Sequence, residues 1–371
     1  MKHDMTTGNP AKTLVVFAIP MILGNLFQQF YNMVDSIIVG KMLGVNALAA
    51  VGSTGSLINL IINLFIGVSI GTNVLVARYY GAHDADAISE TIDTSIITAA
   101  VGGFALIFIG FFLAQPLLTL TGTPSDVIDQ AVLYMRIYFA GMPAFMLYNF
   151  GAAVLRSVGD TRRPLYFLII SGIINVVLNM VFVIVFDWSV AGVAIATVIS
   201  QAMSAIMVCM TLIKEKDATH LDIKKLGVNG SMAWNIIKIG VPAGIQGMVF
   251  SLSNVVVQSS INSFDSSVIV AGNSAAANIE SFVYIGVMAF TQACITFTSQ
   301  NVGAKNLDRV KDGVKTALKI SVPLIFVMAC FLYVFAPQLV SLFNRDPEVV
   351  YYGTLFMRLC VMVVPVTCLT Q

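Results

Sequence analysis

The sequence predicts an all-α integral membrane protein with two parallel six-helix lobes, the second of which ends after about four helices. Composition, apolar runs and an internal repeat predict this class. Of the 371 residues, 57% are hydrophobic and 11% are charged, whereas soluble domains are roughly 45 to 50% apolar and about 25% charged. The mean hydropathy is +0.87. The net charge of +1 gives no basic excess of the kind that nucleic-acid binding needs, so we expect no nucleic-acid partner.

Apolar runs of about 20 residues or more are long enough to cross the hydrocarbon core of a bilayer. The first run contains Gln28, Gln29 and Asn32, and no small-residue cleavage site follows it, so we interpret it as a mature helix and not a signal peptide. The predicted spans are 14–38, 48–76, 93–114, 131–153, 165–186, 190–213, 236–260, 268–298, 316–336 and 351–371.

The basic residues predict the orientation of these spans. Most of them lie before the first span or after an even-numbered span, and few lie on the other side. By the positive-inside rule, the N-terminus and the even-to-odd connections are cytoplasmic. We therefore expect a multi-pass protein of the cell inner (cytoplasmic) membrane. The residues on the cytoplasmic side are Lys2, Lys12, Arg78, Arg156, Arg162, Arg163, Lys214, Lys216, Lys224, Lys225, Lys305, Arg309, Lys311 and Lys315.

An internal repeat with an offset of 222 residues runs without gaps from the first span to the C-terminus. The matches fall on helix-distorting and polar residues, which are hard to replace in a lipid environment. Matched pairs are Pro20 with Pro242, Asn32 with Asn254, Gly81-Ala82 with Gly303-Ala304, Asp86 with Asp308, Met135-Arg136 with Met357-Arg358, and Pro143 with Pro365.

The repeat predicts the domain organisation. Six spans separate the copies, so both lobes have the same topology, which is typical of transporters whose halves are related by an axis along the membrane normal. We expect an N-terminal six-helix lobe over 1–222 and an incomplete C-terminal lobe over 223–371. The counterpart of 150–222 has no copy, so a complete relative should have about 445 residues and twelve helices.

Two acids, Asp35 and Glu280, lie inside predicted spans, whereas the other acids lie in loops, in the N-terminal tail or at span ends. Intramembrane carboxylates are costly and usually functional, although a capping role or a buried hydrogen-bonded pair is the alternative. Neither acid has a basic residue at its depth in the sequence. A carboxylate of this kind can change charge within the membrane, which is what a cation-coupled carrier needs.

Asp35 belongs to a polar stripe on the first span. Gln28, Tyr31 or Asn32, and Asp35 follow i, i+3 or i+4, i+7 spacing, so they share one side of a helix. Interhelical packing by amide side chains is the alternative. Pro20 removes a backbone hydrogen bond before this stripe and lets the helix bend there.

Other spans carry further polar and adaptable side chains. Asn175 and Asn179 lie four residues apart, and so on one face of their span, while Thr197 lies on the next span. The chain has 18 Met and 24 Phe, and those that face a cavity would suit varied apolar guests. A carboxylate beside such a surface would favour lipophilic cations.

Several motifs follow one another in order along the chain. They are Pro20 to Asp35, Val39-Gly40, Leu48-Ala49-Ala50-Val51-Gly52, Leu155-Arg156-Ser157-Val158-Gly159-Asp160-Thr161 with Pro164, and Ser299-Gln300-Asn301-Val302-Gly303-Ala304 with Arg309. In these motifs the chain resembles the multidrug and toxic compound extrusion (MATE) transporters. The resemblance implies twelve helices in two six-helix lobes and export of cationic or amphiphilic compounds by alternating access, in exchange for H+ or Na+.

The resemblance also implies site residues. A cation-coupling network of this family falls on Gln28, Tyr31, Asp35, Asn175, Asn179 and Thr197, with Pro20 where the helix bends. Several relatives have aspartate at the position of Asn179, so the loss of that carboxyl leaves Asp35 as the acid of this lobe. Glu280 resembles an acid of some bacterial members. We expect no cofactor beyond the coupling ion, no metal site, and a monomer in the membrane lipid.

Two other functions are considered. A flippase for lipid-linked precursors of the same broad superfamily would need basic residues in its cavity, and no span interior holds a cluster of them. A membrane enzyme would need a nucleophile or metal ligands at one depth, and the histidines lie outside the spans, so we expect no enzyme. The segment Gly67-Val68-Ser69-Ile70-Gly71 is interpreted as a small-residue packing face.

Overall fold

The structure is a computed structural model that describes residues 3–224, 226–264, 266–342 and 345–370. These residues form eleven α-helices and two short π-helical segments, η1 and η2. The elements in chain order are α1 (Pro10–Ile38), η1 (Val39–Leu43), α2 (Val45–Gly81), α3 (Ala85–Leu120), α4 (Ile128–Ala140), α5 (Met142–Ser157), α6 (Arg162–Met180), η2 (Val181–Val185), α7 (Val190–Lys214), α8 (Gly230–Asn262), α9 (Ser267–Gly303), α10 (Leu307–Ser341) and α11 (Pro347–Thr370).

The predicted spans fall on these helices. Within the described residues, eight helical stretches are long and apolar enough to cross a membrane, and α4 with α5 makes a ninth if the bent pair is one span. The tenth predicted run falls on α11, and its last residue, 371, lies outside the described residues. Several helices are longer than their apolar runs. For example, α3 starts at Ala85 because Asp84 caps its N-terminus by accepting a bond from the Ala87 N–H.

The predicted span over 131–153 differs from the structure. Instead of one helix, α4 and α5 meet at a bend of 47°. The break lies at Gly141, and Pro143 is the second residue of α5. Proline cannot donate to the preceding turn, and it is tolerated in the first turn of a new helix. The sequence shows both residues, but a continuous apolar run hides the bend between them.

The helix boundaries repeat at the offset of 222 residues that the sequence predicts. Both ends of α2 and α9 are related by this number, and so are the starts of α3 and α10. The turns between them also match, since His83 and Lys305 have φ angles of 57° and 58°. Next to them, Asp84 and Asn306 cap the following helices with their side chains. The repeat is therefore a repeat of structure down to single turns.

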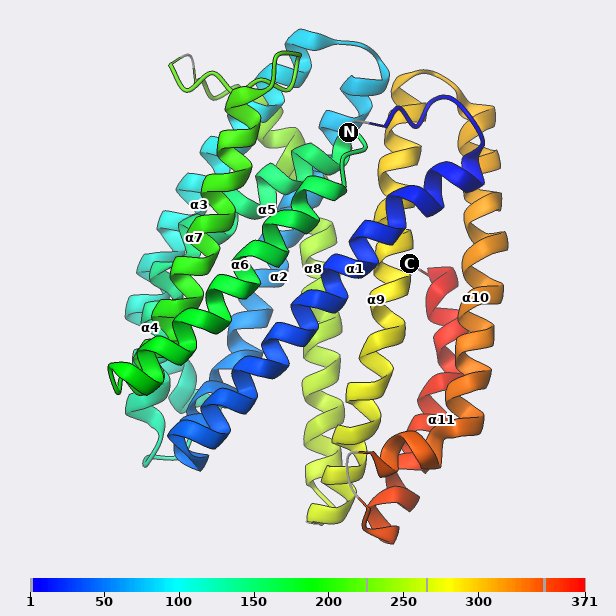
Figure 1. Cartoon of the computed structure of the whole chain (residues 1–371). Helices are drawn as coiled ribbons and strands as arrows, with labels where there is room; N and C mark the ends of the chain where they lie inside the picture. The colour runs from blue at the N-terminus through cyan, green and yellow to red at the C-terminus, as the bar shows by residue number, and fades with distance from the viewer. Residues whose placement is uncertain (1–2, 225, 265, 343–344, 371) are drawn as a thin grey trace.

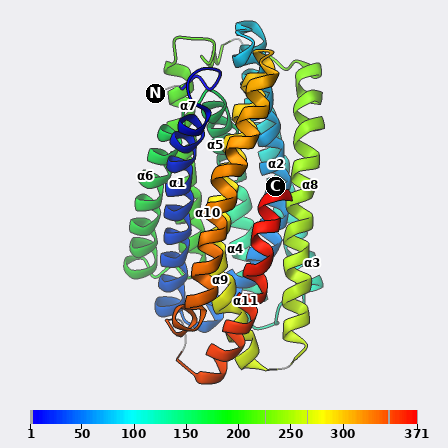
Figure 2. The ribbon, with the colours of Figure 1, turned by 90° about the vertical axis from the view of Figure 1, so that its right-hand side faces the viewer.

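The helices lie in two groups, which we call the first half (α1–α7) and the second half (α8–α11). In Figure 1, α3–α7 gather on one side and α9–α11 on the other, and α1 crosses diagonally between them. Figure 2 shows that α10 and α11 lie side by side on the outside of the second half. The boundary at residues 222 and 223 stays a prediction, because α2 packs closely on both α8 and α9 across it.

Glycines allow α2 and α8 to pack closely. A Cβ added to Gly67 would lie 2.1 Å from the backbone N of Gly244, and one added to Gly71 would lie 2.3 Å from the Ile236 carbonyl oxygen. Only a residue without a side chain fits at this separation. The prediction of a small-residue packing face at Gly67 and Gly71 is confirmed, and its partner is the first helix of the second half.

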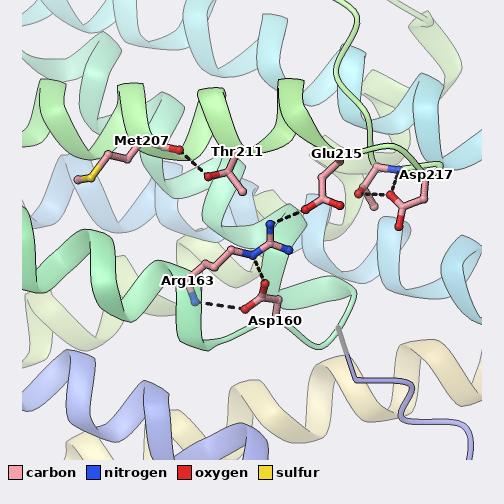
Figure 3. Close-up of polar contacts among 7 residues, drawn as sticks. Asp160, Arg163, Met207, Thr211, Glu215 and Asp217 are labelled. Carbon is pink, nitrogen blue, oxygen red and sulfur yellow. Dashed lines mark hydrogen bonds and ion pairs between the residues drawn. The ribbon is translucent and has the colours of Figure 1, made fainter. Parts of the chain in front are cut away.

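One end of the bundle holds the N-terminus and the connections α2–α3, α5–α6, α7–α8 and α9–α10; we call it the basic end. Here Arg163 at the start of α6 forms ion pairs with buried Asp160 and with Glu215 at the end of α7 (Figure 3). Thr211, one turn before Glu215, donates to the Met207 carbonyl at 2.8 Å. This cluster fixes α6 relative to α7, the two helices that carry Asn175, Asn179 and Thr197.

Candidate functional site

The predicted polar network is centred on Asp35 of α1 and Asn179 of α6. Asn179 Nδ2 donates to Asp35 Oδ1 at 2.6 Å, and the same nitrogen lies 3.2 Å from Asn175 Oδ1. Asn175 and Asn179 are 1% and 0% exposed, so the two amides of one helical face are directed into the first half and meet the carboxyl group there. A hydrogen bond to a charged acceptor in such a buried place is stronger than one in water.

The amide of Asn175 extends this network to α7. Its Nδ2 donates to Thr197 Oγ1 and to Ser200 Oγ, each at 3.4 Å. With the amide turned over, its nitrogen would instead donate to both oxygens of Asp35 at 2.9 Å. A charged carboxylate favours the turned orientation, and a protonated carboxyl can donate to the amide oxygen in the first one. Asn175 can therefore satisfy Asp35 in either charge state.

Further residues bond or pack around the network next to α1. Tyr31 and Gln28 share a side-chain hydrogen bond. Gly172 of α6 lets α1 approach, since an added Cβ there would lie 2.7 Å from a ring atom of Phe27. Tyr134 of α4 is also buried beside this group. The site is a closed set of amides, hydroxyls and one carboxyl between α1, α4, α6 and α7.

Both helices that hold the central bond change to π-helix directly after it. The segment η1 starts four residues after Asp35, and η2 starts two residues after Asn179. The two segments contact each other. Short π-helical turns are frequent at functional sites, because they interrupt the regular hydrogen-bond ladder. The far ends of α1 and α6 therefore meet through irregular turns just beyond the site.

A cleft of about 700 Å³ lies on another side of α1, against α9. Such a volume suits a drug-sized ligand. The side-chain amides of Gln29 and Asn32 form no hydrogen bond with the described part of the chain, so they can bond a guest. Among described residues, the lining is apolar, aromatic or neutral polar: Leu23, Leu26, Phe27, Gln29, Phe30, Asn32, Met33, Ser36, Asn278 and Phe282.

The structure separates some of the predicted site residues. Asp35, Gln28, Tyr31, Asn175, Asn179 and Thr197 lie together. Asn32 lines the cleft instead. Glu280 lies on α9 of the second half, where it shares a hydrogen bond with Cys360 of α11. Asp35 is directed towards α6 and is not among the described residues that line the cleft.

Pro20 is buried within α1, which passes through it as one helix. Its predicted role in bending stays a prediction, as do the roles of the network residues.

Sequence reasoning missed Ser200 and a second buried polar group. Ser200 follows Thr197 by three residues, so their helical spacing was a usable signal. Asn73 of α2 is fully buried and donates to the Ala153 carbonyl at 3.1 Å, while its oxygen accepts from Gln292 at 3.2 Å and Thr296 at 3.1 Å. An amide inside an apolar span was the signal here. This group joins α2 and α5 to α9 of the second half.

Comparisons with known proteins agree with the fold. The chain is 29% identical over 360 residues to the probable multidrug resistance protein YpnP of Bacillus subtilis (strain 168), covering 96% of this chain and 79% of that protein. It is 30% identical to the probable multidrug resistance protein YoeA of the same organism, covering 92% and 75%. A MATE protein crystallised in the straight conformation has the same fold, with a TM-score of 0.90 and 23% identity over 99% of this chain and 82% of that chain.

The model of one protein family, MatE, matches residues 20–181 and 242–371. The two matched segments begin at Pro20 and Pro242, which are equivalent in the 222-residue repeat. The match therefore includes α8–α11 as well as α1–α6, and with them both predicted acids, Asp35 and Glu280. With its many apolar spans, the chain is a multi-pass membrane protein that belongs to the MatE family.

Proposed function

We propose that this protein exports cationic amphiphilic compounds in exchange for H+ or Na+ by alternating access of its two halves. A transporter role follows from the family, and two relatives are named as probable multidrug resistance proteins. The observation that carries the coupling proposal is the hydrogen bond between Asp35 and Asn179. Through this bond Asp35, an acid inside a predicted span, lies where α1 meets α6, with neutral polar partners on α6.

The bond couples ion binding to the shape of α1. While Asp35 is charged, the amides of Asn179 and Asn175 hold the part of α1 that follows Pro20 against α6. We call this part, which lies away from the basic end, the outer part of α1. Neutralising Asp35 with a proton, or sharing it with Na+, weakens these charge-assisted bonds. The outer part of α1 can then leave α6, with Pro20 as the place where the helix bends.

The helix α1 also lines the cleft in which a transported compound would bind. Phe30 and Met33 line the cleft from α1, and Phe282 lines it from α9. A shift of α1 therefore changes the cleft without direct contact between guest and acid. Aromatic faces attract cations and bind flat apolar groups, which favours cationic amphiphiles. The lining holds no basic side chain in the described residues, which argues against a flippase for phosphate-bearing lipids.

The charge distribution supports an orientation. The basic end is the cytoplasmic end by the positive-inside rule, so the N-terminus is cytoplasmic. The cleft lies towards the opposite end of the bundle, from which a bound compound would be released to the outside. We propose the cell inner membrane as the location and a monomer as the working unit, with no enzyme activity and no cofactor besides the coupling ion.

The test is dye transport by the protein in proteoliposomes, under pH and Na+ gradients imposed separately. We expect a cationic dye to move against its gradient when one of the two ion gradients is present. The same vesicles without a gradient give the baseline. If neither gradient drives the dye above this baseline, the antiporter proposal is wrong.

The variant Asp35→Asn tests the role of the acid. We expect gradient-driven transport to fall to the baseline while the amount of folded protein in the membrane stays the same, because Asn cannot change charge. Asp126→Asn is the control, since Asp126 is an exposed acid in the α3–α4 connection. Transport by Asp35→Asn at the rate of the parent would remove Asp35 from the mechanism.

A further inference from the structure

The N-terminal segment, residues 3–8, lies against the second half at the basic end. The Met5 N–H donates to Gln300 Oε1 of α9 at 2.9 Å. The Met5 carbonyl accepts from Asn301 Nδ2 at 3.2 Å and from Nε and Nη2 of Arg309, each at 3.2 Å. Arg309 also donates to the carbonyls of Thr7 and Gly8, the latter at 2.7 Å. A single guanidinium thus binds the carbonyls of three residues within a stretch of four.

The same segment contacts the first half. The His3 N–H donates to the Val158 carbonyl at 3.3 Å. Gly159 has a φ of +83°, and a Cβ added there would lie 2.1 Å from the His3 carbonyl oxygen, so the chain passes directly over this turn. Gln300, which holds Met5, also donates to the Ser157 carbonyl of α5 at 2.7 Å. The segment therefore bridges the α5–α6 turn of the first half and α9 and α10 of the second half.

The side chain of Met5 holds residues 3–8 in an apolar site. Its side chain is fully buried. It packs in one cluster with residues of α1, α9 and α10, and Cys294 packs against that cluster. The buried members of the cluster are Met5, Leu14, Phe17, Ala18, Phe290, Ala293, Phe297 and Ala317. Burying a methionine side chain contributes about 1.5 to 3 kcal/mol, so the segment is held by packing as well as by polar contacts.

We propose that residues 3–8 are a latch that holds the two halves together at the basic end, with Arg309 as its anchor. Separation of the halves there must break either the contacts of Met5 with Gln300, Asn301 and Arg309 or the contact of His3 with Val158. Because Asn9 caps α1 directly after the latch, the latch also ties the start of α1 to the second half. This inference rests on the alternating access proposed above, since opening of the basic end is what the latch would control.

Release of the latch is tested by the reaction of Cys294 with a water-soluble maleimide, in a variant whose other cysteines are replaced by serine. We expect Arg309→Ala to raise the labelling rate about tenfold, because it removes hydrogen bonds from a charged donor. Lys315→Ala is the control, since Lys315 is an exposed cation on the same helix, and it should leave the rate unchanged. An unchanged rate in Arg309→Ala would overturn the role of Arg309.

The consequence for the two halves is tested by the distance between spin labels at Asp86→Cys and Asp308→Cys, in a background with the natural cysteines replaced. These exposed positions are equivalent in the repeat and lie near the basic end of each half. We expect Arg309→Ala to shift the distribution to longer distances, and Lys315→Ala to leave it as in the parent. Raised Cys294 labelling with an unchanged distribution would overturn the latch.

Met5→Gly is the second variant, in case Arg309→Ala folds poorly. It removes the buried side chain while leaving Arg309 in place, and we expect the same shift in the label distance. Thermal unfolding confirms which variants are folded. Neither readout uses a guest or an ion gradient, so failure of the latch and failure of the proposed antiport are distinguishable.

Discussion

At the residue scale, the site consists of one carboxyl group satisfied by neutral groups. Within the described residues, Asp35 has no ion pair, and its carboxylate accepts a hydrogen bond from the amide of Asn179. A basic partner at this position would fix the charge on the carboxylate, whereas amides and hydroxyls can bond either the charged or the neutral form. Asn175 links the network to the hydroxyl groups of Thr197 and Ser200 on α7, which can also donate or accept. The network is thus suited to an acid that gains and loses a cation during each cycle.

The variant Asn179→Leu tests whether the amide supports Asp35. We expect transport to fall about tenfold or more, because a charge-assisted hydrogen bond of about 1.5 to 3 kcal/mol is lost and the carboxylate remains buried without it. The measurement is the initial rate of gradient-driven dye transport. Asn149→Leu is the matched control, since the Asn149 amide donates to the Phe145 carbonyl of its own helix. Equal losses in both variants would show that the effect is not specific to the Asp35 bond.

At the element scale, α1 contacts both halves along its length, as α2 does. Its first turns pack with α9 and α10 through Leu14 and Phe17. Its outer part packs on α6, where Gly24 faces Leu168 and Asp35 bonds Asn179. Figure 1 shows the resulting diagonal path. A bend between these two attachments would move the outer part relative to the second half, and Pro20 lies between them.

The packing of α2 on α8 predicts a stability effect. We expect Gly67→Ala to lower the unfolding temperature of the purified protein by several degrees, because the new Cβ would meet the backbone of Gly244 and overpacking costs about 1 to 3 kcal/mol. Gly52→Ala is the control on the same helix, since nothing lies within 4 Å of a Cβ there. It should keep or slightly raise the unfolding temperature. A thermal shift of equal size in both variants would contradict the close packing.

At the scale of the whole molecule, much of the arrangement could be predicted from the sequence. Apolar runs predicted the helices, and the offset of 222 residues predicted that the second half repeats the topology of the first. The boundaries of α2 and α9 differ by this offset. Helical spacing placed Gln28, Tyr31 and Asp35 together, because these residues repeat in register with the 3.6-residue turn. Asn32 is off this register by about 60° from Asp35, and the structure places it in the cleft.

Other features depended on contacts between distant segments. The latch joins Met5 to Gln300 and Arg309, about 300 residues away, as the separations of 295 and 304 show. No local pattern around Met5 marks it as buried. The bend at Gly141 and the direction of Asp35 towards α6 likewise depend on which helices lie next to each other. Hydrophobic periodicity predicts which face of a helix is buried, but it does not predict which helix packs against that face.

The repeat makes a final prediction about the equivalence of the two halves. Arg136 stacks over the Phe111 ring with its guanidinium carbon 4.8 Å from the ring centre, and its Nε donates to the Phe111 carbonyl at 3.2 Å. Arg358 has the same contacts with Tyr333, at 5.0 Å and 3.2 Å. Equal geometry implies equal stabilisation, since the same pair of interactions ties α3 to α4 and α10 to α11.

We therefore expect Arg136→Ala and Arg358→Ala to destabilise the protein by similar amounts, each about 1 kcal/mol. The two sites share no partner, so the double variant should show the sum of both effects. The measurement is the unfolding temperature of the single and double variants in one detergent. Lys311→Ala is the control, because its ion pair with Asp308 is 3.7 Å long and exposed, and such pairs contribute little. A large effect at one arginine and none at the other would show that the halves share a helix arrangement but not its energetics.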